Sequence, residues 1–102
     1  MALRIITKKR FENKVMKLLL YLETEWSDTV AINFKVTLLE KLELLATQPK
    51  TGVEVNSLKN TRSILITKHN RVYYRIEENK IAVLNMIDTR KNLKKNPFNK
   101  NK

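Results

Sequence analysis

Residues 68–76 read KHNRVYYRI, and this short stretch decides the fold of the chain. His69 and Asn70 suit a tight turn, and the residues after them alternate in character. One face of the resulting strand would hold Val72, Tyr74 and Ile76, and the other would hold Arg71, Tyr73 and Arg75. Two permanent cations and a phenol on one face suit phosphate or carboxylate better than they suit a protein core.

The positive charge of the chain is concentrated in its second half. The whole chain has 21 Lys and Arg against 10 Asp and Glu, a net charge of +11. Residues 1–50 contribute +3 and residues 51–102 contribute +8. Such an asymmetric field attracts polyanions, although lysine also serves simply to keep small proteins in solution. Charge alone therefore leaves both interpretations open.

Composition excludes several classes of protein. A chain of 102 residues with 42% apolar residues forms one domain with one modest core. Without cysteine and with a single histidine, we expect no disulfide, no thiol nucleophile and no metal site. A single glycine argues against a phosphate-binding glycine-rich loop, so no cofactor is expected. No apolar run approaches the ~18 residues that span a bilayer, and no signal-peptide pattern is present, which predicts a cytoplasmic protein without a membrane.

The first half of the chain predicts a strand and two helices. Residues 3–7 are typical of a short strand, and helical periodicity starts at Lys8. The apolar stripe of the first helix holds Phe11, Val15, Leu18, Leu19, Leu22 and Trp26. We expect Trp26 in the core at the corner between the helices, whereas Met16 and Leu20 lie off the stripe as surplus apolar surface.

A second helix should follow at once. Ser27 is a suitable N-cap, and Asp28 favours the positive end of the helix. Its buried stripe would hold Ala31, Phe34, Leu38, Leu42 and Leu45, and Gln48-Pro49 would end it. The short connection makes the two helices an antiparallel hairpin.

The second half predicts three further strands after a loop over residues 50–61. They cover residues 62–67, 71–77 and 80–87, with reversals at His69-Asn70 and Glu78-Asn79 where Asn tolerates the left-handed conformation. The order is β-α-α-β-β-β. We therefore expect an α+β fold, an antiparallel sheet with a helical hairpin packed on one face.

The end of the chain is basic. After Asp88 there is no acidic residue, and the cations are Arg90, Lys91, Lys94, Lys95, Lys100 and Lys102. Composition predicts one domain over residues 1–91 and a partly disordered tail over residues 92–102. Arg90 and Lys91 should add their charge to the open face of the sheet.

These elements and several short motifs together resemble the RelE/ParE superfamily of toxins from bacterial type II toxin–antitoxin systems. The motifs are Trp26-Ser27, Arg62-Ser63-Ile64, HNRVYYR at residues 69–75, Asp88-Thr89-Arg90 and KKNPF at residues 94–98. The resemblance covers about residues 3–98. It implies a RelE-like fold and a toxin that arrests growth when its antitoxin is degraded, a class associated with plasmid stabilisation.

The resemblance implies one of two activities. RelE-like members cut messenger RNA on the ribosome, and for such an endoribonuclease Arg62, Arg71 and Arg90 match the cations that hold the phosphate. Ile64 replaces a second basic position, and Phe98 replaces the aromatic proton-transfer residue without offering a hydroxyl. Tyr73 or His69 would have to substitute. ParE-like members inhibit DNA gyrase, and the Asp88-Thr89-Arg90 ending favours this branch.

We therefore expect a ParE-like gyrase inhibitor, with a RelE-like mRNA interferase as the alternative and a non-toxic basic nucleic-acid-binding module as a second alternative. The expected partner is an acidic antitoxin encoded nearby, which would bring the pair to operator DNA. Its segment would cross a surface made of Arg71, Arg75, Arg90, Lys91, Met16 and Leu20.

Overall fold

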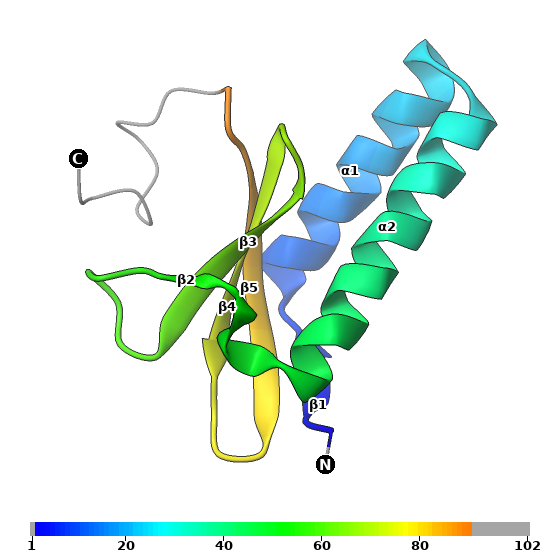
Figure 1. The fold of residues 1–102 in the computed structure, drawn as a ribbon. Helices are drawn as coiled ribbons and strands as arrows, with labels where there is room; N and C mark the ends of the chain where they lie inside the picture. Colours follow the sequence, from blue (N-terminus) through cyan, green and yellow to red (C-terminus); the bar gives the residue numbers. More distant parts are fainter. Residues whose placement is uncertain (1, 91–102) are drawn as a thin grey trace.

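The structure is a computed structural model that describes residues 2–90. Figure 1 shows a sheet with a helical hairpin on one side. The elements are β1 (Arg4–Thr7), α1 (Lys9–Glu25), α2 (Asp28–Thr47), the 3-10 helix η1 (Pro49–Thr51), β2 (Val53–Glu54), β3 (Thr61–Thr67), β4 (Asn70–Ile76) and β5 (Lys80–Asp88). The predicted α+β order is confirmed. Two short elements are not predicted from the sequence: η1, which begins at Pro49 just before the predicted loop, and the two-residue strand β2 within that loop.

The five strands are arranged in the order β1-β5-β4-β3-β2. Strands β2 to β5 are antiparallel to their neighbours, whereas β1 pairs with β5 in parallel. The first strand therefore lies beside the last one, and the helical hairpin between them crosses one face of the sheet (Figure 1). No helix within residues 2–90 is long and apolar enough to cross a membrane.

The hairpin forms where the sequence predicts it. Ser27 caps α2, because its Oγ accepts a hydrogen bond of 3.1 Å from the backbone N–H of Val30. The helix ends at Thr47, two residues before Pro49. The predicted stripe of α2 is buried and packs on the sheet through Phe34, Leu38, Leu42 and Leu45.

The core between sheet and helices includes one tyrosine hydroxyl. Tyr74 is fully buried; its hydroxyl donates a hydrogen bond of 2.6 Å to the carbonyl of Pro49 and accepts one of 2.9 Å from the N–H of Gly52. Burial is the main cause that raises the pKa of Tyr74, so the hydroxyl stays protonated. Gly52 must be glycine, because a Cβ there would lie 2.6 Å from Tyr74 Oη and 2.7 Å from the Ser63 carbonyl. This contact fixes η1 against the sheet.

The prediction that Trp26 is a core residue is wrong. Its side chain is 68% exposed, and it forms the C-cap of α1 at the tip of the hairpin. Figure 1 shows that this tip projects away from the sheet. The apolar periodicity thus continues one turn beyond the last sheet contact, and the final position of the stripe has no core to enter.

The turn between β3 and β4 also differs from the prediction. It falls on Lys68 and His69, while Asn70 already pairs with Thr67 in the sheet. The Thr67 hydroxyl donates to Asn70 Oδ1 at 2.8 Å and accepts from the His69 N–H at 3.2 Å, so a side chain closes this turn. Within residues 2–90, the non-glycine residue with positive φ is Asn60 (φ 56), not Asn70 or Asn79.

Candidate functional site

The face of the sheet opposite the helices is polar and cationic. We call it the open face and define it by the cross-strand rows of β3, β4 and β5, which are Leu65–Arg71–Ile87, Ser63–Tyr73–Asn85 and Thr61–Arg75–Ala82. The alternation read from residues 71–76 thus predicts the orientation of β4 correctly. A bulge between Tyr73 and Tyr74 keeps Asn85 on this face.

Arg71 lies in the first row of the open face. Its Nη1 donates a hydrogen bond of 2.8 Å to Ser63 Oγ, which draws the guanidinium over β3. Within residues 2–90, no carboxylate forms an ion pair with Arg71. Its charge is therefore available to an anionic group of a partner.

Arg75 is held differently. Its Nε donates to Glu77 Oε2 at 3.0 Å, and Lys80 Nζ lies 3.6 Å from Glu77 Oε1. The hydrogen bond from Arg75 is the main cause that holds the pKa of Glu77 below its ordinary value, and the charges of Arg75, Lys80 and Lys8 add to the effect. Glu77 therefore orders the cations at this end of the open face.

Arg62 lies on the opposite face of the sheet. In the register it pairs with Tyr74, whose side chain is in the core. Its guanidinium donates to the carbonyl of Gly52 at 2.8 Å and pairs with Glu54 at 3.3 Å. Arg62 therefore fixes the segment from η1 to β2, and the structure does not bring it together with Arg71.

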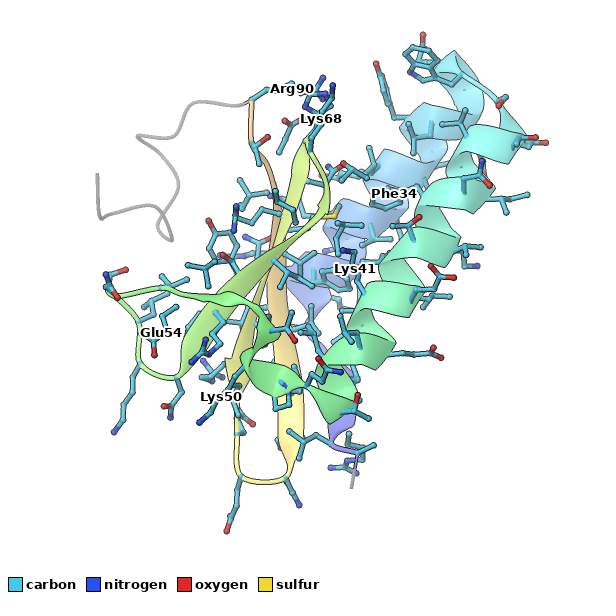
Figure 2. All side chains as sticks on the ribbon, in the orientation of Figure 1. Phe34, Lys41, Lys50, Glu54, Lys68 and Arg90 are labelled. Atoms are coloured by element: carbon cyan, nitrogen blue, oxygen red, sulfur yellow. The ribbon has the colours of Figure 1, made fainter. Side chains whose placement is uncertain are left out.

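Arg90 occupies a third place, beyond the end of β5. Its Nε and Nη2 donate to the two carboxylate oxygens of Asp88 at 3.1 and 2.9 Å. The hydrogen bond with Asp88 is the main cause that raises the pKa of Arg90, and the nearby Tyr21 adds to it. Figure 2 shows Arg90 beside Lys68 at one end of the sheet, with Lys50 and Glu54 towards the other.

Arg90 borders a cavity of about 420 Å³ between the hairpin tip and the β3–β4 turn. The cavity is lined by Leu18, Tyr21, Leu22, Trp26, Val30, Asn33, Phe34, Thr37, Thr67, His69, Asn70 and Arg90. Its walls are mainly apolar side chains from both helices, with polar groups at the sheet end. His69 thus lies beside Arg90 and not with the open-face residues.

Tyr73 is the remaining candidate for proton transfer. Its side chain lies in the middle row of the open face and is only 5% exposed, next to Ser63 and Asn85. Lys91 and Phe98, like the predicted tail over residues 92–102, lie outside the described residues. The structure therefore brings together Arg71, Tyr73 and Arg75 from the predicted set.

The helical hairpin carries a second kind of surface. Met16 and Leu20 are 62% and 60% exposed, as their position off the α1 stripe predicts. A similar exposed stripe on α2, which is absent from the predicted surface, is formed by Ile32, Val36 and Leu39. The signal was present, because these residues recur at helical spacing beside the core stripe. We call the exposed apolar residues of the hairpin the hairpin surface; they are Met16, Leu20, Tyr21, Trp26, Val30, Ile32, Val36 and Leu39.

A helical hairpin on one face of a small, mostly antiparallel sheet, with arginines on the other face, defines a compact cationic α+β domain. Residues 5–93 match the model of a family described as the ParE toxin of the type II toxin–antitoxin system, parDE. The chain belongs to this ParE toxin family. Membership confirms the resemblance to RelE/ParE toxins and implies a cognate antitoxin as partner.

Solved structures support the same fold. A chain of the chromosomal ParDE system from P. aeruginosa superimposes with a TM-score of 0.72 at 8% identity, covering 85% of this chain and 96% of that chain. The conserved hypothetical protein HP0894 from Helicobacter pylori gives 0.54 at 22% identity, and a copper-bound mutant toxin from the same organism gives 0.51 at 24%; each covers 85% of this chain and 94% of its own. At these identities the likeness concerns the fold alone. No curated protein matches the sequence.

Proposed function

We propose that this toxin arrests growth by inhibiting DNA gyrase, and that a cognate acidic antitoxin neutralises it. The observation that carries the proposal is the separation of the three arginines of the alternative ribonuclease site. Arg62 lies on the helix side of the sheet, Arg71 on the open face, and Arg90 beyond β5, paired with Asp88. Inhibition through protein contacts needs no such shared site.

A ribonuclease site would need these cations around one phosphate, together with a group that transfers a proton. The Arg62 guanidinium is already bound to two backbone carbonyls and to Glu54. Redirecting it would leave those carbonyls without a donor and would detach η1 from the sheet. The geometry thus favours a protein that acts by binding.

The hairpin surface is the candidate region for contact with gyrase. Large apolar side chains gather on both helices there, and monomeric proteins seldom leave such clusters exposed without an interaction. Trp26 at the tip has the character of an anchor residue, because tryptophan is enriched among the residues that dominate binding energy. Because gyrase acts on the chromosome, a gyrase inhibitor would act in the cytoplasm.

The antitoxin would cover both surfaces. An acidic segment that folds on binding would pair with Arg71 and Arg75 and would cover Met16 and Leu20. The net charge of +11 favours such a partner. Binding to operator DNA would then come from the antitoxin's own domain. A structure of the complex in which the segment touches neither surface would contradict this arrangement.

The test is controlled expression of the free toxin, combined with mapping of RNA 5′ ends in cells and a gyrase supercoiling assay. We expect lost supercoiling with intact messenger RNA. Trp26→Ala should weaken the inhibition, whereas the matched variant Val53→Ala, on an exposed apolar residue of β2, should not. Ribosome-phased cuts with intact supercoiling would overturn the proposal in favour of the mRNA interferase, for which the free charge of Arg71 beside Tyr73 is the supporting feature.

A further inference from the structure

A second cavity, of about 560 Å³, lies where α1 begins. It is lined by Lys8, Arg10, Leu58, Lys59, Thr61, Arg75 and Leu84. We call it the basic groove. Its walls come from the start of α1 and from the loop before β3, and its floor comes from the third row of the open face. The volume falls in the ~300–1,000 Å³ range of small-molecule pockets, and the hollow opens to the surface.

The basic groove concentrates positive charge from three distant parts of the chain. Lys8, Arg10, Lys59 and Arg75 line it, and none of its lining residues is acidic. At the edge of the groove, Glu77 forms an ion pair with Arg75. Lys80 forms an ion pair with the same carboxylate and offsets the negative charge of Glu77. Four positive charges therefore remain around one cavity.

The start of α1 adds to this field. Lys8 is the N-cap and forms no side-chain capping hydrogen bond, and Lys9 and Arg10 follow it; the acidic residue of the first turn is Glu12, whose carboxylate accepts a hydrogen bond from the Thr7 hydroxyl. Cations at this end oppose the helix dipole, and backbone N–H groups of the first turn have no partner inside the helix. By contrast, α2 starts with the usual Ser27 and Asp28. Three consecutive basic residues outweigh the one carboxylate of this turn, and a bound anion would offset their repulsion from the helix dipole.

We infer that the basic groove binds the phosphodiester backbone of a nucleic acid. Lysine and arginine side chains donate hydrogen bonds and accept none, and the Thr61 hydroxyl already donates to the carbonyl of Lys59. A peptide would bring backbone N–H groups that need acceptors, which this lining scarcely offers. Phosphate and sugar oxygens are acceptors, and they repeat one negative charge per nucleotide. The chemistry of the groove thus fits a backbone of phosphates better than an acidic peptide.

This inference goes beyond gyrase inhibition and does not depend on it. Of the two cations offered to the antitoxin, Arg71 is not among the groove's lining residues and Arg75 is shared between the two surfaces. The groove would give the toxin its own contact with nucleic acid, without an antitoxin domain. Because the contacts involve phosphates only, binding should be independent of base sequence and should weaken steeply with salt.

The test measures fluorescence anisotropy of a labelled oligonucleotide with the purified full chain over a range of salt concentrations. The groove variant is Arg10→Gln with Lys59→Gln. The matched control is Lys35→Gln with Lys68→Gln, which removes the same charge from exposed residues on α2 and in the β3–β4 turn. Losing two phosphate contacts should lower the slope of log K against log salt by about 1.4–1.8 and the affinity at fixed salt at least about tenfold.

Each possible result decides the matter. A groove-specific loss supports the inference. Equal losses in both variants, or no binding by the unchanged chain, would overturn it. A polyglutamate peptide that displaces the oligonucleotide at equal charge concentration would overturn it in favour of a protein partner. Lys59→Gln alone, in an exposed loop, retains the test if the double variant folds poorly. The assay contains no gyrase, so its failure is distinct from failure of the proposed target.

Discussion

Tyr73 and Tyr74 are neighbours in one strand, yet they belong to two very different environments. Tyr74 faces the helices, is fully buried, and uses its hydroxyl to fix Gly52 and Pro49. Tyr73 faces the other way, among Ser63, Asn85 and two arginines. The comparison of the two faces of β4 teaches that alternate residues carry stability and recognition separately. Substitutions on the covered face should therefore change folding, and substitutions of the partly exposed Arg71 and Arg75 on the open face should change binding.

The largest difference should come from two isoleucines of β5. Ile81→Ala removes a fully buried side chain on the covered face and should lower the free energy of unfolding by about 2–5 kcal/mol. Ile87→Ala, in the first row of the open face, should cost about 1 kcal/mol or less. Urea denaturation of both variants measures the difference, and equal losses would show that the open face is also core.

A second comparison uses the two arginines that the sequence analysis assigned to one site. Arg62→Ala should lower the free energy of unfolding by about 1.5–3 kcal/mol, because it removes charge-assisted hydrogen bonds to backbone carbonyls. Arg71→Ala removes one hydrogen bond, to Ser63 Oγ, so it should cost less, about 1 kcal/mol, but should weaken antitoxin binding about tenfold or more. Denaturation measures the effect of each variant on stability, and calorimetric titration with the antitoxin measures its effect on binding. If Arg62→Ala weakened antitoxin binding instead, the division between the faces would be wrong.

The third prediction concerns the tyrosine hydroxyl on the covered face. Tyr74→Phe removes two hydrogen bonds and leaves the Pro49 carbonyl without its donor, so unfolding should become easier by about 1–3 kcal/mol. Tyr21→Phe, on an exposed residue of α1, is the control and should change the free energy by less than about 0.5 kcal/mol. Thermal unfolding followed by circular dichroism measures both variants. If Tyr74→Phe left the stability unchanged, the hydroxyl would not be what fixes η1.

The smallest expected effect is a dependence on acid at the margin of the open face. The pKa of Glu77 is lowered in the folded state, chiefly by the hydrogen bond from Arg75. Its stabilising contribution is therefore present above the ordinary value of 4.5 and is lost as the pH falls through the folded pKa. The difference in melting temperature between the unchanged chain and Glu77→Gln should shrink below about pH 4.5. A constant difference from pH 3 to 7 would contradict the ion pair.

The fold could be predicted because the spacing of apolar residues and the positions of capping and turn residues indicate the same elements. The stripe of α2, the Ser27 cap and the alternation in β4 each determine one element and its buried face. Trp26 was misplaced because periodicity does not reveal where the sheet beneath a helix ends. The parallel pairing of β1 with β5 has no local signal, since alternation predicts a strand and not its neighbour.

The candidate site was predictable only within a single strand. Every second residue of a strand lies on the same face, so Arg71, Tyr73 and Arg75 lie together. The resemblance places Arg62 in one site with Arg71, and this is wrong. A signal for its true position exists, because Arg62 alternates with Ile64 and Ile66 along the strand, so it shares a face with these two core residues. The basic groove was beyond prediction, because Lys8, Lys59 and Arg75 meet only through tertiary structure. Arg90 could not be placed from its motif, since its position depends on the path of the chain after β5.

The pairing of β1 with β5 also has a consequence during synthesis. Residues of β1 such as Ile5 find their partners in Ile81 and its neighbours, which the ribosome makes some seventy-five residues later. At about 5–20 residues per second, the nascent chain spends about 2–8 seconds between the end of α2 at Thr47 and the end of β5 at Asp88, with a completed helical hairpin and no finished sheet to cover it. Contacts this distant in sequence also slow folding itself. A toxin built in this order cannot act while it is still being translated, so the cell has that interval in which to supply the antitoxin.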